Sequence, residues 1–368
     1  MISGAAVGGL LLLVMSSCQA IYLPGGLTVN FAPGSGDPLA ESDLGARVRG
    51  PRGFSIGTWI DGIANARFLR FTTTGDLLVS APRQGKVFLV EKDGDGGGRA
   101  DGKKVLLEGL DKPHGLALRD DWLYVAETGA VLRVRFDAGS RTVSGDIERI
   151  ITDIPPDGGH WTRTIGFGPD GGLYVSVGST CNVCIEDNDK RATIVRYEPD
   201  GSDGRVYARV LRNAVGFAWH PQSRDLYATD NGRDRLGDDF PPCELNRVVD
   251  GGHYGWPFYN GDNIPDPDFG DHPQKPAEAI PPVYGFRAHN APLGIAFYDA
   301  EAFPERYHDA AFVALHGSWN RSEKDGYEVV VVWVDGGEAR AESFITGFEK
   351  DEDVIGRPVD VAVGPDGA

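Results

Sequence analysis

Short apolar stretches alternate with polar turns along most of the chain. The pattern is clearest at residues 158–184, where an alternating segment, a Gly-Pro-Asp-Gly turn and a second segment rich in Tyr and Val follow one another. Alternation with a period of two is typical of β-strands with one buried face, and turns rich in Gly, Pro and Asp join such strands into hairpins. No apolar pattern of helical period is long enough to compete. The sequence therefore predicts an all-β protein.

The unit of strand, turn and strand recurs along the chain. Six copies begin near residues 71, 116, 165, 215, 295 and 359, with about 45 to 60 residues between most turns and one larger gap. Repeats of this length are typical of β-propellers, in which each repeat forms one blade. Six copies predict a six-bladed β-propeller. The last copy reaches only a second Gly-Pro-Asp-Gly turn before residue 368, so we expect the last blade to be truncated at the C-terminus.

Length and composition favour one large domain. The 368 residues can bury a large core, and the 51 Gly and 24 Pro suit many tight turns. We expect the propeller at residues 53–368, after a tether rich in Gly, Pro and Asp at residues 21–52. The longest insertion, at about residues 262–289, is expected to cross the face where ligands bind. The formal charge of −18 disfavours binding to a polyphosphate backbone, so nucleic acid is not expected as a partner.

The first twenty residues differ from the rest. An apolar run at residues 10–15 and two serines lead to Cys18, which is typical of an export signal that ends at a bacterial lipoprotein cleavage site. The run is too short to span a membrane as a helix. We therefore expect a signal segment at residues 1–20 and a periplasmic or otherwise exported protein, with Cys18 as the candidate lipid anchor. A simple cleaved signal and a misassigned start stay open as alternatives, because no Lys or Arg precedes the run.

The remaining cysteines are Cys181, Cys184 and Cys243. The first two are spaced to close a small disulfide loop in an oxidising compartment. They do not form a haem-attachment motif, because Ile185 and not histidine follows the second cysteine. A zinc site would need two more soft ligands, and only one cysteine is left. We favour a structural disulfide over a metal site.

Polar side chains recur where the predicted blade strands begin or end. The set consists of His160, Arg163, Arg212, Asn213, Asn320, Arg321 and Arg357. Strand ends of a propeller converge on one mouth of the ring, so we expect these side chains to lie close together. Arginine binds planar carboxylates through paired hydrogen bonds, and histidine removes protons near neutral pH. The set predicts a pocket for an anion with several carboxylates and a base beside it. No dinucleotide or triphosphate motif is present.

The ordered motifs resemble a known family. GGHWTRT, FGPDGGLYVSVGSTCNVC, LRNAVGFAWHP, ATDNGRD with GDDFPPCELN, GGHYGWP and GSWNR are similar to segments of the soluble dehydrogenases for sugars that depend on pyrroloquinoline quinone (PQQ). The resemblance is strongest to their L-sorbosone dehydrogenase-like branch and runs from about residue 53 to the end. It implies a six-bladed propeller with PQQ and a calcium ion at the channel mouth. It also implies oxidation of an aldose or a sorbosone-like sugar, with a separate electron acceptor.

The resemblance also implies roles for individual residues. His160 falls where the family has the histidine that takes the proton of the sugar hydroxyl. Arg212 and Asn213 match a pair beside the quinone oxygens, where developing negative charge needs stabilising. Two backbone carbonyls would hold the calcium ion, those of Gly232 and Arg233.

Arg357 matches an arginine that binds the carboxylates of PQQ. Three positions depart from the glucose enzymes of the family. Gly159 replaces the aspartate that orients the catalytic histidine, Asn320 replaces a lysine that binds PQQ, and Val359 replaces a second arginine. Two nearby arginines are candidates to compensate, Arg163 and Arg321.

Two other classes of function stay open. A propeller without catalytic activity, binding carbohydrate or protein, is favoured by the lost lysine and second arginine and opposed by the retained His160. A calcium-dependent hydrolase such as a lactonase would need carboxylates from several segments to converge on one ion. The acidic residues here are instead concentrated at residues 230–244.

Overall fold

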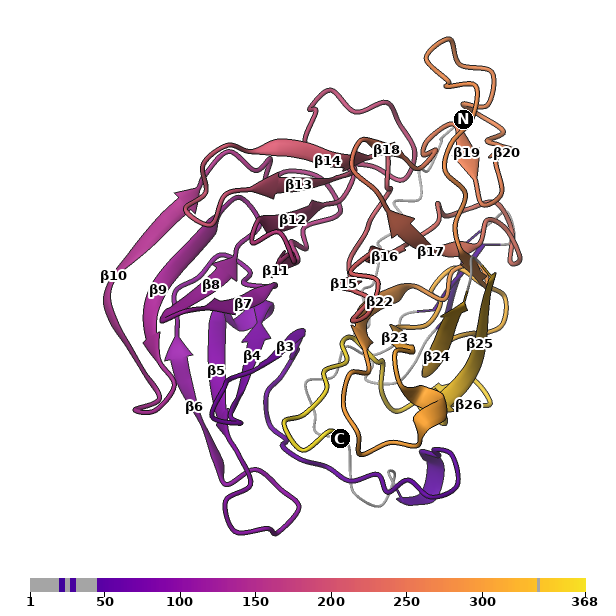
Figure 1. Ribbon diagram of the computed structural model, residues 1–368. Helices are drawn as coiled ribbons and strands as arrows, with labels where there is room; N and C mark the ends of the chain where they lie inside the picture. The colour runs from indigo at the N-terminus through magenta and orange to yellow at the C-terminus, as the bar shows by residue number, and fades with distance from the viewer. Residues whose placement is uncertain (1–19, 24–26, 31–44, 336–337) are drawn as a thin grey trace, which may run out of the picture.

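The computed structural model describes residues 20–23, 27–30, 45–335 and 338–368. Five sheets of four or five strands stand around a central axis, so the predicted all-β propeller is confirmed (Figure 1). In each sheet the strands follow one another from the inside outwards, in the order of the sequence. The first blade consists of β3 (Phe68–Phe71), β4 (Leu77–Ala81), β5 (Lys86–Glu91) and β6 (Gly102–Leu107). The second consists of β7 (Leu116–Arg119), β8 (Trp122–Ala126), β9 (Val131–Asp137) and β10 (Thr142–Ile151).

The other three blades follow the same plan. The third contains β11 (Ile165–Phe167), β12 (Leu173–Val177), β13 (Thr193–Tyr197), β14 (Arg205–Arg209) and, parallel to β14, β18 (Gly252–His253). The fourth contains β15 (Phe217–Trp219), β16 (Leu226–Asp230), β17 (Cys243–Val248) and β21 (Tyr284–Phe286). The fifth contains β22 (Pro292–Phe297), β23 (Ala311–Leu315), β24 (Glu328–Asp335) and β25 (Glu338–Ile345).

Several small elements lie outside the blades. They are the hairpins β1 (Ala20–Leu23) with β2 (Leu27–Asn30), β19 (Tyr259–Asn260) with β20 (Ile264–Pro265), and β26 (Glu349–Lys350) with β27 (Asp353–Val354), and the 3-10 turns η1 (Pro82–Gln84) and η2 (Glu305–Tyr307). Residues 1–19, which hold most of the predicted signal segment and Cys18, lie outside the described residues. In the part of the chain that is described, no helix is long and apolar enough to cross a membrane.

The core lies between neighbouring blades. The second strands β4, β12, β16 and β23 are buried at every position, whereas the outer strand β10 is mostly exposed. A second strand is buried on both faces because a neighbouring blade packs against each side of it. For β4 and β23, residues 54–66 and 361–363 cover the side that has no neighbouring blade. Each fully buried Val or Leu side chain contributes about 1.5–3 kcal/mol. The stacked apolar faces therefore hold the ring together and fix where the loops emerge.

The described residues do not form a sixth blade. Residues 355–368 add one extended segment, which lies between β22 and β3 in the ring. The carbonyl of Val359 accepts a hydrogen bond from Gly294 N at 3.1 Å, and the carboxylate of Asp360 accepts one from Leu69 N at 2.8 Å. The described residues thus form five blades where six were predicted, because no described strand pairs with this segment to widen it into a blade.

Residues 54–60 cross the same gap. They form no strand. The ring of Phe54 instead packs against Phe303 of the fifth blade at 4.7 Å between centroids, and Trp59 packs against Phe71 of the first blade at 5.9 Å. The packed structure also begins a little before residue 53, since Val48 is buried and its neighbour in sequence forms a bridge to Thr346.

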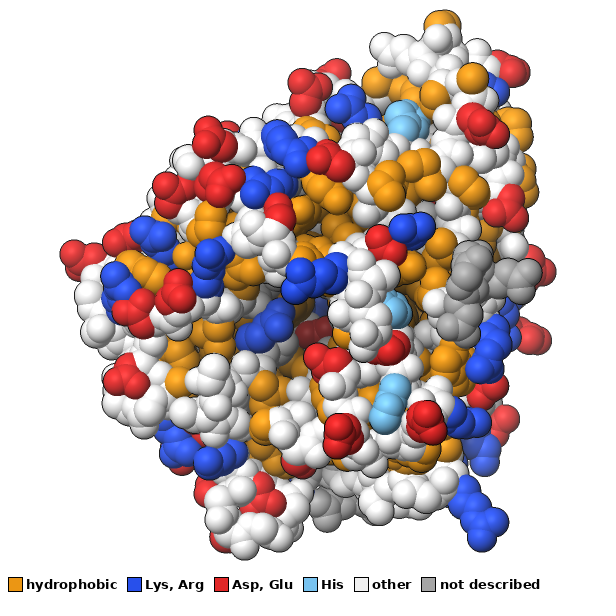
Figure 2. All heavy atoms as spheres, viewed as in Figure 1, with side chains coloured by type: hydrophobic (Ala, Val, Ile, Leu, Met, Phe, Trp, Pro, Cys, Tyr) orange, Lys and Arg blue, Asp and Glu red, His pale blue; other side chains and the backbone are white. Residues whose placement is uncertain are grey.

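A channel runs through the centre of the ring. The five inner strands and residues 360–363 line a cavity of about 480 Å³. Figure 2 shows one end of the molecule hollowed at its centre, with both positively and negatively charged side chains around the hollow. The inner strands therefore do not close the axis, and residues at their ends can reach a common space.

Candidate functional site at the channel mouth

Two kinds of segment carry the candidate residues. His160, Arg212 and Arg357 lie just before inner segments of the ring, whereas Gly232 and Asn320 lie in loops that follow the second strand of a blade. Paired strands of a blade are antiparallel, so an inner strand begins where the second strand ends. All these segments therefore emerge on one face of the propeller.

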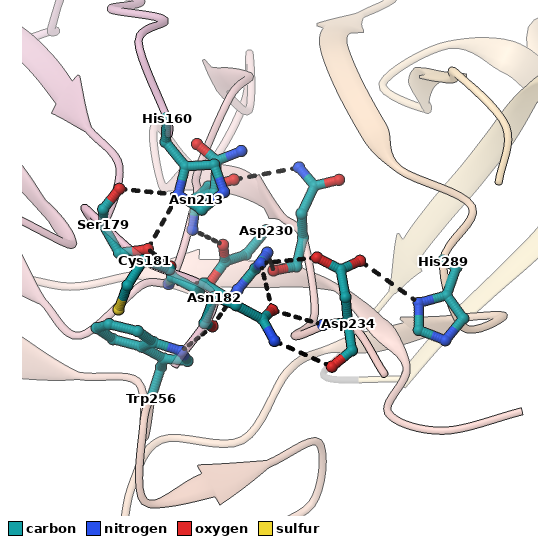
Figure 3. Close-up of polar contacts among 11 residues, drawn as sticks. His160, Ser179, Cys181, Asn182, Asn213, Asp230, Asp234, Trp256 and His289 are labelled. Atoms are coloured by element: carbon teal, nitrogen blue, oxygen red, sulfur yellow. Dashed lines mark hydrogen bonds and ion pairs between the residues drawn. The ribbon is translucent and has the colours of Figure 1, made fainter. Parts of the chain in front are cut away.

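His160 is held by Ser179, which follows β12. The imidazole Nδ1 lies 2.9 Å from the carbonyl oxygen of Ser179 and 2.9 Å from its Oγ (Figure 3). A carbonyl oxygen only accepts hydrogen bonds, so Nδ1 carries the hydrogen and Nε2 keeps its lone pair. The Ser179 hydroxyl in turn donates to the carbonyl of Cys181 at 2.8 Å. The histidine is thus positioned as a base that acts through Nε2.

The electrostatic surroundings keep His160 neutral. Burial of the ring, followed by the positive charge of Arg212, lowers its pKa to about 3. Close packing with Asn213 is possible because Gly178 lies between them. A Cβ at Gly178 would lie 2.5 Å from the Asn213 Oδ1 and 2.7 Å from the His160 Cβ. Only glycine allows the base and the amide to lie side by side here.

Arg212 is fixed by a network around Asn182. Its guanidinium donates to the carbonyl of Asn182 at 2.9 Å, to the Asn182 Oδ1 at 2.9 Å and to the carbonyl of Asn231 at 3.0 Å. The carboxylate of Asp234 lies 3.2 Å away, and Trp256 Nε1 donates to the Asn182 carbonyl at 3.3 Å (Figure 3). All three guanidinium nitrogens have partners, so the charge is held rigidly next to His160.

Asp230 anchors the backbone of this pair. It ends β16, and its carboxylate accepts hydrogen bonds from Arg212 N at 2.8 Å and Asn213 N at 2.6 Å. Burial raises its pKa to about 7. Its cross-strand neighbour Glu244 accepts from Gly261 N at 3.0 Å, and burial together with the charge of Asp230 raises the Glu244 pKa to about 8. Backbone amides therefore hold the carboxylates of Asp230 and Glu244.

Gly232 and Arg233 lie in the loop between β16 and β17. Neither carbonyl oxygen accepts a hydrogen bond from any residue that the structure describes. A Cβ at Gly232 would lie 2.6 Å from the Pro242 carbonyl oxygen, so glycine is needed at that position. The side chain of Arg233 is buried and donates to both carboxylate oxygens of Asp266 at 2.7 Å. Two free carbonyls on a fixed loop suit a hard cation such as calcium.

Asn320 and Arg357 complete this face. Asn320 is buried, and neither its Oδ1 nor its Nδ2 has a hydrogen-bond partner in the described chain. A buried amide without partners indicates a missing polar ligand, so this position fits a bound polar group. Arg357 donates through Nε to the His316 carbonyl at 2.9 Å and through Nη2 to the Gly317 carbonyl at 2.6 Å.

Arg163 and Arg321 contact protein groups. Arg163 is 0% exposed and donates to the carbonyls of His160 and Pro155 at 2.8 Å each. It therefore positions the backbone of the base. Arg321 donates to the carbonyl of Asp238 and, at 3.1 Å, to the carboxylate of Asp239. Both arginines support loops in this structure, and their contact with the cofactor stays a prediction.

The predicted disulfide is confirmed. Cys181 and Cys184 are joined with an S–S distance of 1.94 Å, and Cys243 is a buried free thiol. The loop closed by the disulfide carries Asn182. Sequence reasoning did not single out Ser179, Asn182 or Arg67. The first two lie within the GSTCNVC motif, and Arg67 directly precedes an inner strand, the same position that led to His160 and Arg212.

Comparison with known proteins places the chain in a family. The model of the TrAA12-like family matches residues 49–240 and 264–355, which is more than half of the chain. The chain belongs to the TrAA12-like family. An uncharacterized protein of Borreliella burgdorferi is 39% identical over 201 residues, 53% of each chain. The PQQ-dependent pyranose dehydrogenase of Coprinopsis cinerea is 23% identical over 82% of this chain and 46% of its own.

The aldose sugar dehydrogenase YliI of Escherichia coli is 26% identical over 73% of this chain and 74% of its own. The motif resemblance to PQQ-dependent sugar dehydrogenases is therefore confirmed at the level of the family. The chain spans about half the length of the first two curated relatives, with 53% and 46% of their residues covered.

Several solved structures share the fold. The holo form of the PQQ domain of the Coprinopsis cinerea enzyme has a TM-score of 0.72 at 21% identity, over 87% of this chain and 93% of its own. Two Trichoderma reesei structures of the carbohydrate-active enzyme family AA12 are also 21% identical. The iodide structure has a TM-score of 0.75 over 87% and 93% of the two chains, and the calcium structure 0.71 over 82% and 87%.

Proposed function

We propose that this protein is an exported dehydrogenase that depends on PQQ and calcium and oxidises an aldose or a sorbosone-like sugar. The observation that carries the proposal is the neutral His160, whose Nδ1 is engaged by Ser179 and whose Nε2 is left as a base beside the fixed guanidinium of Arg212. The names of the relatives support the same chemistry, since they include pyranose and aldose dehydrogenases and a holo PQQ domain.

PQQ, when bound, supplies a hydride acceptor for the carbon that carries the reacting hydroxyl. His160 Nε2 takes the hydroxyl proton as that C–H bond breaks and the C=O bond forms, so the sugar loses one hydride and one proton. Arg212 and Asn213 would stabilise the negative charge that develops on the quinone oxygens next to the base. The carbonyls of Gly232 and Arg233 would hold calcium, and Asn320 and Arg357 would bind polar groups of the cofactor.

The proposal includes several finer points. The segment at residues 359–363, which lies in the ring between β22 and β3, is proposed as the inner strand of a sixth blade. Electrons are proposed to pass from the cofactor to a separate acceptor. Export and a lipid anchor at Cys18 are proposed from the N-terminal sequence alone. The engaged acids Asp230 and Glu244 argue against a lactonase, because backbone amides already hold their oxygens.

Reconstitution with PQQ and calcium tests the proposal. The purified protein is titrated with PQQ in the presence of Ca²⁺, and then with a panel of aldoses, aldehydes and uronic acids while the quinone absorbance is followed. Binding of one PQQ per chain and loss of the oxidised quinone band on addition of a sugar are expected. Binding without reduction by any member of the panel would favour the non-catalytic propeller. Absence of PQQ binding by the folded, calcium-loaded protein would reject the proposed cofactor.

A further inference from the structure

An arginine outside the predicted set occupies the channel mouth. Arg67 directly precedes β3, and its backbone N–H donates to the Ser80 carbonyl at 2.9 Å. Its guanidinium makes no hydrogen bond or ion pair with any residue that the structure describes. The guanidinium lies over the indole of Trp161, whose centroid is 5.9 Å from the Arg67 Cζ. Trp161 is the residue after His160, so this guanidinium lies on the same face as the base.

Arg67 and Arg357 lie on neighbouring segments of the ring, which the hydrogen bond from Leu69 N to the Asp360 carboxylate joins at 2.8 Å. Burial, and after it the charge of Arg357, lowers the pKa of Arg67 to about 10. The carboxylate that opposes this effect, that of Asp360, is itself engaged by Leu69 N at 2.8 Å, and burial raises its pKa to about 7. Two like charges close together in a partly buried space are unfavourable unless an anion lies between them.

The two histidines beside these arginines carry no charge. His114, which packs against Trp161 at 5.9 Å, has its pKa lowered to about 3 by burial and by Arg67. The pKa of His316 is also lowered well below its usual value by burial and by Arg357. Both imidazoles are therefore neutral. Arg357 lies over the ring of Tyr327 at 5.3 Å, as Arg67 lies over Trp161, so each guanidinium is supported on one side by an aromatic ring.

We propose that Arg67 and Arg357 form a two-arginine clamp for the carboxylates of PQQ. The inference rests on the function proposed above and adds a residue to it. PQQ is a planar tricarboxylate, and arginine pairs with carboxylates through two parallel hydrogen bonds, whereas a neutral sugar offers no such group. Val359 leaves this chain without the second arginine of the glucose enzymes. Arg67 supplies that charge from the neighbouring blade. Both Nη atoms of Arg163 and of Arg321 donate to protein groups, whereas Arg357 uses only Nε and Nη2 and its Nη1 makes no hydrogen bond with the described residues.

Binding of PQQ to variants tests the clamp without relying on turnover. PQQ is titrated into the calcium-loaded protein, and affinity is read from quenching of tryptophan fluorescence and from quinone absorbance. Arg67→Gln is expected to weaken binding about 10- to 100-fold, as the loss of one charge-assisted pair does. Arg67→Lys keeps the charge but not the paired geometry, so its affinity for PQQ should lie between those of the wild type and Arg67→Gln. Arg83→Gln is the matched control, because Arg83 is exposed but also acts on the charge of Arg67.

Each result of these titrations either supports or overturns the clamp. Weakened binding in both Arg67 variants, with Arg83→Gln within about twofold of wild type, supports the clamp. Unchanged affinity in Arg67→Gln, while the wild type binds PQQ, overturns the clamp and leaves the proposed function standing. Unchanged affinity with a raised KM for sugar also overturns it and makes Arg67 a substrate contact. If the wild type itself does not bind PQQ, the proposed function fails and the clamp fails with it.

Discussion

The imidazole of His160 and the backbone of Ser179 form the central contact of the site, with Nδ1 lying 2.9 Å from the Ser179 carbonyl oxygen. The residue before the histidine, Gly159, has no side chain that could orient the ring. A carbonyl does not titrate, and Ser179 is 0% exposed, so the orientation of the base is fixed at every pH at which the protein is folded. Ser179 thereby holds this imidazole as carboxylates and carbonyls hold histidines in many other sites.

Replacement of the base tests its role directly. In His160→Ala, we expect kcat to fall about 10²- to 10⁴-fold, because general-base assistance is lost. PQQ affinity should stay within a few-fold of wild type, since the arginines, Asn320 and the loop carbonyls are unchanged. His308→Ala is the matched control, because His308 is an exposed histidine in the loop that precedes β23, away from the site. A kcat that remains near wild type in His160→Ala would remove the histidine from the mechanism.

The loss of activity in acid should occur at an unusually low pH. The His160 pKa is lowered to about 3 by burial and by Arg212, so the ring stays neutral well below its ordinary range. We expect kcat/KM to vary little between pH 5 and 7 on this account and to fall only as the pH approaches 3 to 4. The pH dependence of kcat/KM reports the pKa values of the free enzyme, in which His160 has the surroundings described above. A fall with a midpoint near pH 6.5 would show that His160 is solvated in the working enzyme.

Much of the fold was predictable from the sequence, because the alternating strands and their turns are local signals. The stretch that ends in Leu173–Val177 became β12 with its predicted bounds. The site was less predictable, because motifs mark positions but not the direction in which a side chain points. Arg163 and Arg67 both precede inner strands, yet the first is fully buried and donates to protein carbonyls, whereas the second lies over the ring of Trp161. The difference depends on packing between blades, which no single segment determines.

Buried neutral histidines should make the protein sensitive to acid. The His114 pKa is lowered to about 3, chiefly by burial, so between pH 6.5 and 3 the folded protein binds fewer protons than the unfolded chain. The free energy of unfolding therefore falls as the pH falls through this window, and the contribution is fully present above it. In His114→Gln the slope of this free energy against pH should decrease by about 1.4 kcal/mol per pH unit near pH 5. Urea unfolding from pH 4.5 to 7 measures it, and equal slopes would contradict the burial of a neutral ring.

The disulfide should matter more to the site than to the fold. In the double variant Cys181→Ser with Cys184→Ser, only a very short loop is released, which costs about 2 kcal/mol of stability. The same loop carries Asn182, which holds the guanidinium of Arg212 at 2.9 Å through both its carbonyl and its Oδ1. We expect kcat to fall about tenfold and PQQ affinity to weaken, with circular dichroism unchanged.

Reduction provides the matched control for that variant. Dithiothreitol should lower the activity of the wild type towards the level of the double variant and leave the double variant unaffected. Equal activity of the oxidised wild type and the double variant would show that the loop is held by its hydrogen bonds alone.

The buried ion pair of Arg233 and Asp266 should be the strongest support of the loop between β16 and β17. The two side chains are 7% and 1% exposed, and one guanidinium nitrogen lies 2.7 Å from both carboxylate oxygens. Removal of one partner leaves an uncompensated buried charge, so Arg233→Met should lower the free energy of unfolding by about 3–5 kcal/mol. The double variant Arg233→Met with Asp266→Leu should be less destabilised than the sum of the single variants. Asp268→Ala is the control, since that carboxylate is 60% exposed and its pair with Arg233 contributes at most about 1 kcal/mol. Equal losses from Asp266 and Asp268 variants in urea unfolding would show that the insertion is not anchored through the buried pair.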